Sequence, residues 1–317
     1  MLPGSKNSSA REEQGRLSAK KPILRIRSRI IQSIRRFFIE RDYLETETPC
    51  LIPAPAPEAN IDAIPSRQGF LQTSPELCMK RLLAAGYHRI FQVSRCFREG
   101  ERGSHHLPEF TMLEWYRAGI DYQALMDECE ELFLFACEDL GIADRLVYQG
   151  LNISLTRPWE RISVTEAFER FASLPMKKAL ELECFDKLMV SEIEPHLGIS
   201  EPTFLYDYPS SLAALARLKR SERGLAERFE LYVGGLELAN AFSELTDVDE
   251  QKRRFKKERE KRERGGRDVY PLPEKFLDAL QHMPRSAGIA LGVDRLVMVL
   301  TDQKHIDKVV AFTPEEL

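Results

Sequence analysis

The order of apolar patterns along the chain predicts an α+β fold, a mostly antiparallel β-sheet flanked by helices. The clearest sign is a hairpin over 229–239, in which Gly234-Gly235 tolerates the positive φ angles of a two-residue turn. A second pair of strand patterns, 90–95 and 109–116, is also consecutive. Because the helical patterns are grouped away from these hairpins, a sheet of alternating parallel βαβ units is not favoured.

The N-terminal part contains a helical pattern followed by a short strand pattern. Over 22–38 apolar residues recur at steps of three and four between arginines, which predicts an amphipathic helix with Pro22 in its first turn. Residues 1–21 are polar and lack the apolar core of a signal peptide, so they are predicted to form a flexible tail. A strand is expected over 43–49 and a proline-rich loop over 52–57.

Further strand and helix patterns follow along the rest of the chain. The two-glycine turn sets Glu237 opposite Tyr232 in the predicted hairpin. The stretch 145–201 is predicted to mix short helices with loops, and residues 22–317 are expected to form one domain. The other predicted elements are strands over 70–73 and 288–292 and helices over 75–85, 121–140 and 294–300.

Composition limits the classes of partner. The chain has 317 residues, of which 43% are hydrophobic, and a formal net charge of −4, so it lacks the basic field typical of nucleic-acid binders. Its 6 cysteines include no C-x-x-C pair, which predicts reduced thiols in the cytoplasm and neither a zinc ribbon nor a disulfide framework. No apolar run approaches the roughly 20 residues of a membrane span, so no membrane partner is expected.

Two segments combine residue types in a way that is more specific than either segment alone. In the first, Arg98 is followed by a charged loop and by the strand pattern 109–116; in the second, 288–295, two glycines precede Arg295. Taken separately, they also fit an ordinary exposed hairpin and a tight turn. Together they resemble motifs 2 and 3 of the class II aminoacyl-tRNA synthetases, and 43–49 resembles motif 1.

The resemblance is close to the lysyl branch of that class. Residues 74–82 and 236–245 resemble its two amino-acid-binding segments, and the resemblance covers 22–317 in family order. It implies a class II synthetase catalytic domain that activates an amino acid with ATP. Bacterial lysyl-tRNA synthetases carry an anticodon-binding domain before this unit, whereas only about twenty polar residues precede it here. A tRNA partner is therefore not expected.

The chemistry implied by the resemblance needs a fixed cation, because the substrate carboxylate and the α-phosphate of ATP are both anions. Arg98 is expected to bridge them, and Phe110 and Arg295 to stack on the adenine ring. Arg98 and Arg295 are the expected catalytic residues. Mg²⁺ that accompanies ATP is expected at Glu237 and Glu244, and no prosthetic group is expected. The implied ATP-binding residues are Arg98, Gly100, Glu101, His106, Leu107, Phe110, Glu237, Leu238, Asn240, Gly292 and Arg295.

The implied amino-acid pocket is acidic. Lysine brings two ammonium groups, and burying either of them without a partner costs several kcal/mol. By resemblance Glu76 meets the amino group near the carboxylate, while Glu114, Tyr116 and Glu244 meet the distant ammonium. Any single glutamate is usually a solvated surface residue, but the set favours a diamino acid as substrate. The implied amino-acid-binding residues are Ser74, Pro75, Glu76, Glu114, Tyr116, Glu244 and Ala290.

The motif 2 loop departs from the pattern of many relatives, which have an additional acidic and an additional basic residue there. Glu101 is expected to replace the missing acid and Arg102 the missing positive charge. The adjacent pair His105-His106 is not predicted to bind a metal, because neighbouring residues of a strand point to opposite sides.

The architecture resembles the elongation factor P lysine ligase family, in which the activated amino acid is transferred to a lysine of a protein. Ala290 supports this resemblance, because the synthetases generally have glycine there and the ligase family has alanine. The resemblance implies (R)-β-lysine in preference to lysine as substrate, elongation factor P as acceptor, and a homodimer formed through motif 1.

Two other functions remain open from the sequence. One is a truncated lysyl-tRNA synthetase paralogue that acts on tRNA or a small amine, and the other is a non-catalytic regulator that binds a ligand. The run 252–264 carries 9 basic and 3 acidic residues. It is predicted to be a solvated helix rather than an RNA-binding stripe, and it would alternatively attract an acidic acceptor protein.

Overall fold

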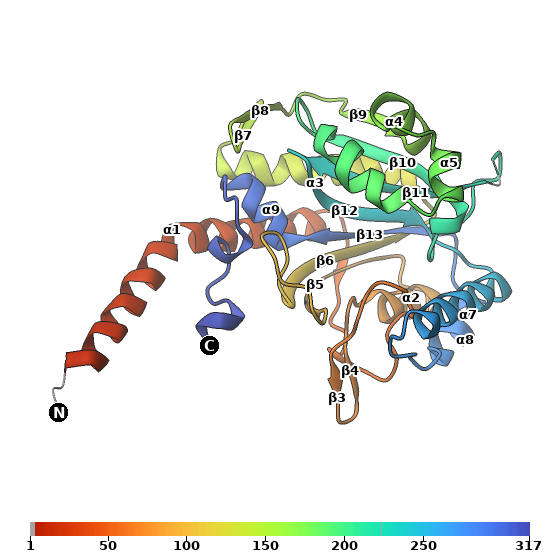
Figure 1. Ribbon diagram of the computed structural model, residues 1–317, viewed down its shortest axis with the longest axis horizontal. Helices are drawn as coiled ribbons and strands as arrows, with labels where there is room; N and C mark the ends of the chain where they lie inside the picture. The colour runs from red at the N-terminus through yellow and green to blue at the C-terminus, as the bar shows by residue number, and fades with distance from the viewer. Residues whose placement is uncertain (1–3, 223) are drawn as a thin grey trace.

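The computed structural model describes residues 4–222 and 224–317, with side-chain environments from residue 13 onward. Its centre is an eight-stranded sheet (Figure 1). The two outermost strand pairs are parallel and the pairs between them antiparallel, so the predicted α+β class is confirmed. In sheet order the strands are β1 (Leu44–Glu45), β5 (Arg89–Phe97), β6 (Glu109–Ala118), β13 (Ser286–Gly292), β12 (Leu236–Ser243), β11 (Leu225–Val233), β10 (Thr203–Pro209) and β9 (Glu160–Ser163).

One face of this sheet is covered by three helices. The amphipathic helices α1 (Gly4–Ile39) and α3 (Tyr122–Leu140) and the apolar helix α9 (Val293–Leu300) contact one another or the central strands. Their apolar side chains form the largest core cluster, which includes Trp115 from β6 and Phe229 from β11. This buried layer holds the central strands in place, and their other faces are free to carry polar side chains.

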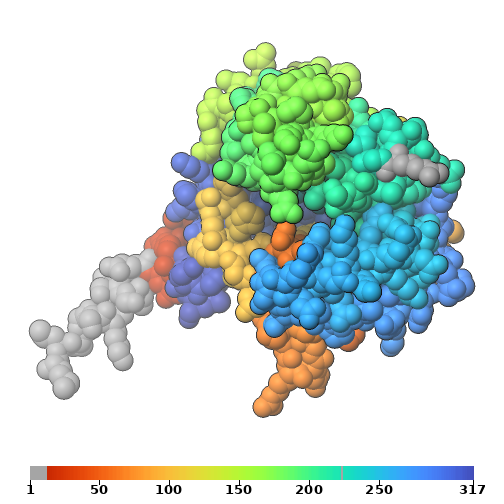
Figure 2. Space-filling model, turned by 45° about the vertical axis from the view of Figure 1, so that its right-hand side comes forward, coloured from red at the N-terminus to blue at the C-terminus, as the bar shows by residue number. Residues whose placement is uncertain are grey.

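The opposite face is covered only towards its two ends. At one end α2 (Glu76–Ala84), α7 (Val248–Arg264) and α8 (Glu274–Leu280) share a core cluster. At the other end α4 (Val164–Phe171), α5 (Met176–Glu181) and α6 (Phe185–Leu188) pack on β9, β10 and β11 through a separate cluster. In Figure 2 the region of α7 and α8 forms a blue mass and that of α4 to α6 a green mass, and the orange segment around residues 50–70 protrudes below the blue mass. The middle of the sheet face is left for a cavity.

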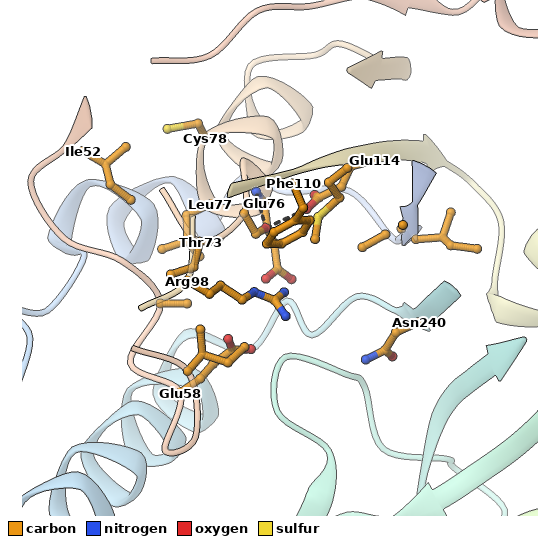
Figure 3. Close-up of a pocket in the computed structure, with 18 of the residues that line it drawn as sticks. Ile52, Glu58, Thr73, Glu76, Leu77, Cys78, Arg98, Phe110, Glu114 and Asn240 are labelled. Carbon is orange, nitrogen blue, oxygen red and sulfur yellow. Dashed lines mark hydrogen bonds between the residues drawn. The ribbon is translucent and has the colours of Figure 1, made fainter. Parts of the chain in front are cut away.

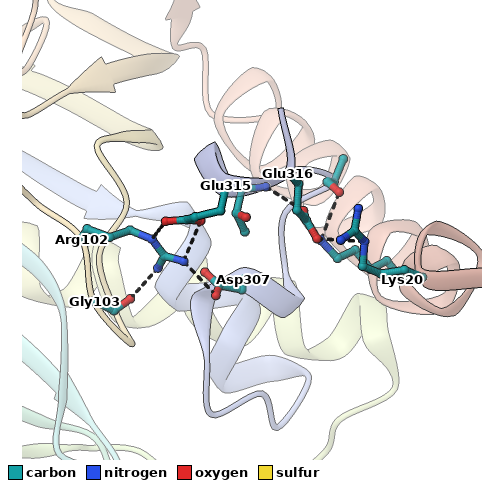
Figure 4. A network of polar contacts seen from close by, with 9 residues as sticks. Lys20, Arg102, Gly103, Asp307, Glu315 and Glu316 are labelled. Atoms are coloured by element: carbon teal, nitrogen blue, oxygen red, sulfur yellow. Dashed lines mark hydrogen bonds and ion pairs between the residues drawn. The ribbon is translucent and has the colours of Figure 1, made fainter. Parts of the chain in front are cut away.

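Helix α1 begins earlier than the sequence predicts. The helix is continuous from Gly4 to Ile39 and contains Pro22 in its interior, so the predicted start at Pro22 is wrong. The buried Lys20 Nζ lies 2.9 Å from Glu316 Oε2 and donates to the Ala311 carbonyl at 3.1 Å (Figure 4). Residues 4–21, predicted to belong to a tail, are therefore helical, and Lys20 near the end of this stretch contacts the C-terminal segment.

Two predictions that rest on local signals are confirmed. Gly234 and Gly235 have φ angles of 61° and 75°, and Tyr232 pairs with Glu237 across the hairpin. Helix α3 begins after Asp121, whose side chain accepts hydrogen bonds from two backbone N–H groups, and ends at Gly141 with a φ of 76°. These elements follow from capping and turn chemistry within a few residues.

Other predicted boundaries are only partly right. The strand predicted over 43–49 is limited to β1, and the segment predicted as a strand over 70–73 forms β4 in a small separate sheet. The stretch 145–201 contains strands as well as short helices, so the prediction of helices and loops alone is wrong. The strands outside the main sheet are β2 (Leu51–Ile52), β3 (Pro65–Ser66), β4 (Gly69–Leu71), β7 (Arg145–Tyr148) and β8 (Leu151–Ser154). Among the described helices, none is long and apolar enough to cross a membrane.

Candidate active site

A cavity of about 530 Å³ lies over the central strands of the sheet. Side chains of β6 alternate between the two faces of the sheet, so even-numbered residues face the cavity while Trp115 packs into the core below. On β13 the small residues Ala290 and Gly292 face the same way, and Ala290 pairs with Glu114 on one side and Asn240 on the other. The cavity-facing residues of β6 are Phe110, Met112, Glu114 and Tyr116.

Gly288 makes room for the side chains at one end of the cavity. A Cβ atom at this position would lie 2.2 Å from Cε1 of Tyr116 and 2.6 Å from Oε1 of Glu244. Neither group is free to move away, because both residues are buried. A residue without a side chain is therefore needed on β13 opposite Tyr116.

Arg98 reaches into the cavity from the loop after β5 (Figure 3). Its backbone N–H donates to the Pro108 carbonyl at 2.9 Å, which closes the motif 2 loop. The guanidinium lies 5.1 Å from the ring of Phe110 and 3.7 Å from Glu101 Oε1, and in the described part of the chain its buried Nε has no hydrogen-bond partner. This cation is held in place with hydrogen-bonding capacity left for an anionic ligand.

Arg295 joins the motif 2 loop to the β11–β12 hairpin. Its Nη1 donates to the Glu237 carbonyl at 2.8 Å and lies 3.3 Å from Glu237 Oε2. Its Nη2 lies 2.5 Å from Nε2 of His106, whose pKa is lowered by burial and by Arg295 itself. A neutral His106 accepts the hydrogen bond from the guanidinium. Arg295, Phe110 and Gly292 line the same cavity, as the prediction of an adenine site requires.

The two predicted magnesium ligands are not brought together. Glu237 is the second residue of the extended strand β12 and Glu244 directly follows its last residue. Seven residues at roughly 3.3 Å each therefore separate them by about 20 Å. Glu237 lines the cavity with 38% of its side chain exposed, whereas Glu244 is fully buried and does not line it. The acid that influences Glu237 is Glu230 of β11. Burial is the largest cause that raises the pKa of Glu237, and the negative charge of Glu230 is the second. The sequence analysis did not single out Glu230.

A buried carboxylate, Glu114, forms the centre of the predicted amino-acid pocket. Its Oε1 accepts from Ser74 Oγ at 2.6 Å and its Oε2 from the Tyr116 hydroxyl at 2.7 Å. Burial is the largest cause that raises the pKa of Glu114 to about 7, and the negative charge of Glu76 is the second. Ser74, Glu76, Glu114 and Tyr116 line one cavity, as predicted together with Ala290. Pro75 instead precedes the first residue of α2 and does not line the cavity.

Lys80, which the sequence analysis did not assign to the site, closes this acidic pocket from behind. Its buried Nζ lies 2.6 Å from Glu76 Oε1 and 2.5 Å from Glu244 Oε2. Burial alone would lower the pKa of Lys80, but Glu244 and Glu76 raise it above its ordinary value, so the amine is charged. Three acids, with Glu114 as the third, thus surround one lysine. Burial raises the pKa of Glu244 to about 8 and that of Glu114 to about 7, so an ammonium group bound beside them would favour their ionised forms.

Replacing Lys80 by methionine is expected to lower the free energy of unfolding by about 3 kcal/mol, because a buried ion pair that loses one partner leaves an uncompensated charge. Urea denaturation measures this change. The matched control is Lys177→Met on the exposed surface of α5, for which a change within about 0.5 kcal/mol is expected. Equal stability of the two variants would contradict the role of Lys80.

Only some of the other motif 2 residues that were predicted at the ATP site lie in the cavity. Glu101, His106 and Leu107 line the cavity as predicted, and Gly100 does not. Arg102 lies outside it, because its guanidinium bonds Glu315 at 2.8 Å and Asp307 at 3.0 Å (Figure 4). The hypothesis that Arg102 replaces the missing charge at the ATP site is therefore wrong.

His105 and His106 both line the cavity, so they do not point to opposite sides as the sequence analysis assumed. The reason is that the segment between β5 and β6 is a loop and not a strand. The described residues contain no cluster of three or more His, Cys, Asp or Glu side chains suited to a metal ion.

Comparison with known proteins defines the class to which this fold and cavity belong. A family model described as tRNA synthetases class II (D, K and N) matches residues 11–316. Leu238 and Asn240 of β12, together with Arg98 of motif 2 and Arg295 of motif 3, line the cavity. The chain belongs to this family of class II synthetases.

Within the family, the chain is similar to proteins with a more specific name. It is 40% identical over 313 residues to the elongation factor P–(R)-beta-lysine ligase of Pseudoalteromonas translucida (strain TAC 125), a match that covers 93% of this chain and 96% of the relative. It is 41% identical, with the same coverage, to the ligase of the same name from Salmonella gallinarum (strain 287/91 / NCTC 13346).

Proposed function

We propose that the protein is an ATP-dependent ligase that activates (R)-β-lysine, or lysine, as an adenylate and transfers it to a lysine side chain of elongation factor P. The names of its relatives support this assignment. The observation that carries it is one cavity in which Arg98 faces the same space as the acids Glu76 and Glu114. Such a cavity matches a substrate that has a carboxylate at one end and ammonium groups further along.

In the first step a carboxylate oxygen of the amino acid attacks the α-phosphorus of ATP, and pyrophosphate leaves. Arg98 holds both anions and neutralises the charge that develops between them. Phe110 supplies an aromatic face and Arg295 a planar guanidinium for the adenine ring. No general base is needed for this step, because the attacking carboxylate is already ionised.

Magnesium is proposed to bind together with ATP. Glu237 would hold it with Glu230 nearby, since burial first and the charge of Glu230 second raise the pKa of Glu237, and a hard divalent cation would compensate the charge of both carboxylates. The other ligands of such an ion would be phosphate oxygens and water. When bound, the ion supplies positive charge to the phosphates of ATP.

In the second step the ε-amine of the acceptor lysine attacks the carbonyl carbon of the adenylate, and AMP leaves as the amide forms. Pyrophosphate exchange and the transfer of labelled lysine test the assignment. Exchange distinguishes the ligase from a non-catalytic regulator, and transfer to elongation factor P rather than to tRNA distinguishes it from a truncated synthetase. If the labelled lysine is found on tRNA and not on elongation factor P, the proposed acceptor is refuted.

We expect (R)-β-lysine to be used in preference to lysine. Ala290 places a methyl group on the cavity floor between Glu114 and Asn240, where it reshapes the amino-acid end of the pocket. Pyrophosphate exchange with the two isomers at equal concentrations measures the preference, with the Michaelis constant for ATP as an internal control. A higher kcat/KM for lysine would show that the methyl group does not select the β isomer.

The affinity for lysine is expected to fall as the solution becomes more acidic. Glu114, with its pKa raised to about 7, is mostly neutral below that pH and then no longer attracts an ammonium group. Because one proton must leave for one ammonium to bind, and about half of Glu114 is already protonated at pH 7, the KM for lysine should rise roughly fivefold from pH 7 to pH 6. Exchange kinetics between pH 6 and 8 check this, and a constant KM for lysine would contradict it.

We also propose a homodimer that forms through motif 1. Strand β1 is at the edge of the main sheet, and Ile39 and Leu44 beside it are 60% and 50% exposed. An edge strand with exposed apolar neighbours is a surface that a second copy would cover. Sedimentation equilibrium of the whole chain tests this assignment.

A reducing compartment, the cytoplasm, is the proposed location. It is supported by the 6 cysteines, all of which are free thiols, as expected in a reducing environment.

A further inference from the structure

Glu58 lies in the cavity, although no motif of the sequence analysis includes it. The residue belongs to the loop between β2 and β3, which forms the wall of the cavity that faces the sheet. In Figure 3 the side chains of Glu58 and Phe110 lie on opposite sides of Arg98. Glu58 therefore adjoins the arginine that is proposed to hold the reacting carboxylate, on the side away from the sheet.

The loop that carries Glu58 is anchored by a buried arginine of α7. Arg262 Nη1 donates to the carbonyls of Glu58 and Ile61, both at 2.8 Å, and its Nη2 donates to Asp62 Oδ1 at 2.7 Å. The guanidinium also lies 4.1 Å from the ring of Tyr270. Because its donors are used on both sides of the loop, Arg262 fixes the backbone at Glu58. Arg262 is thus an exception to the solvated helix predicted for 252–264.

Most of the other acids that line the cavity are already paired, including Asp294, whose Oδ1 lies 2.5 Å from Arg27 Nη1. Glu76 contacts Lys80, Glu101 lies near Arg98, and Glu237 contacts Arg295. Glu114 accepts two hydroxyl groups. Within the described residues, the carboxylate of Glu58 has no hydrogen bond or ion pair, and only its backbone groups are bonded. Glu274, the first residue of α8, lines the cavity and has no such partner either, but it is exposed, whereas Glu58 is partly buried. Glu58 is therefore the unpaired acid of this cavity that is better shielded from solvent.

We propose that Glu58 is the catalytic base of the transfer step, which accepts a proton from the ammonium group of the incoming acceptor lysine. This inference rests on the proposed function. The chemistry needs such a group, because a lysine amine with a pKa of about 10.4 is protonated at pH 7 in all but roughly one molecule in a thousand or fewer. A protonated amine has no lone pair with which to attack the adenylate.

The step balances with the groups present. Glu58 takes one proton, the nitrogen lone pair forms the bond to the carbonyl carbon, and the bond from that carbon to the phosphate oxygen breaks. The nitrogen loses its second proton to the departing phosphate of AMP as the amide forms. Burial is the largest cause that raises the pKa of Glu58 to about 7, and the negative charge of Glu76 is the second. The positive charge of Arg98 acts in the opposite direction. A base with a pKa near the working pH transfers protons most effectively.

The variant Glu58→Gln in the full chain separates this role from substrate binding. Three rates are compared at pH 7: pyrophosphate exchange, trapping of the adenylate by hydroxylamine, which is already neutral, and transfer to elongation factor P. Exchange and trapping are expected to stay within about twofold, while transfer falls about 100-fold, which is typical for loss of a general base. The transfer rate of the variant should then rise roughly tenfold per pH unit as the acceptor amine loses its proton unaided.

The matched control is Glu260→Gln, an exposed acid on α7, which should leave all three rates unchanged. Transfer by Glu58→Gln at the wild-type rate would overturn the proposal. An equal loss of exchange and transfer would also overturn it, because Glu58 would then bind substrate. If the unmodified protein exchanges pyrophosphate but does not label elongation factor P, the proposed acceptor fails and this inference fails with it.

Discussion

Replacing Arg98 by alanine is expected to lower kcat/KM for pyrophosphate exchange by about 1,000-fold, the upper range for loss of a preorganised charge in an active site. The reason is electrostatic: without this cation two anions must approach each other in a cavity with little water. The measurement is the exchange rate as a function of lysine and ATP concentrations. The fold should persist, because within the described residues the side chain of Arg98 makes only the distant ion pair with Glu101 and the contact with the ring of Phe110.

A control for this experiment lies three residues earlier on β5. Arg95 has 53% of its side chain exposed, compared with 23% for Arg98, and its nearest acid is Glu109 at 3.7 Å. Arg95→Ala should leave exchange within about twofold of the wild type, as expected for a surface ion pair. If both variants keep full activity, Arg98 does not join the two reactants and the assignment of the cavity is wrong.

Replacing Glu114 by glutamine is expected to lower kcat/KM for the amino acid roughly 100-fold, since an amide keeps the shape but cannot compensate a buried ammonium. The Michaelis constant for ATP should change little, because Glu114 lies at the amino-acid end of the cavity with Ser74 and Tyr116. Steady-state exchange kinetics with each substrate varied in turn measure the two effects separately.

The same strand offers a control, Glu109→Gln, because 55% of the Glu109 side chain is exposed at the start of β6. This change should leave both Michaelis constants as they are. If the Michaelis constant for ATP in Glu114→Gln rises as much as the Michaelis constant for lysine, the substitution has collapsed the cavity. An unchanged lysine constant would show that Glu114 does not hold an ammonium group.

Much of the site was predictable because its residues lie on one strand or close to one turn. Alternation along β6 places Phe110, Glu114 and Tyr116 on one face whatever the rest of the chain does. The two-glycine turn likewise sets Tyr232 opposite Glu237. Motif resemblance added the expectation that these separate segments share one binding site, and most of the predicted residues line one cavity.

The errors concern contacts between distant parts of the chain. Glu230 and Glu237 are brought together by the hairpin, yet the sequence analysis paired Glu237 with Glu244, just past the other end of the same strand. Arg102 carries the charge that the motif 2 loop lacks, but the C-terminal residues Asp307 and Glu315 bind it elsewhere. A charged residue in a loop can pair in several ways, and only the folded chain selects one.

The amino-acid sequence by itself determined the fold class, the register of the β11–β12 hairpin, the limits of α3 and the face of β6 that carries the chemistry, because caps, turns and alternation act over a few residues. The tertiary structure decided that Lys80 balances Glu244, that Arg262 holds the loop of Glu58, and that α1 extends past Pro22 to meet Glu316. These contacts join residues far apart in the chain, and their free energy depends on burial and on partners that no local pattern contains.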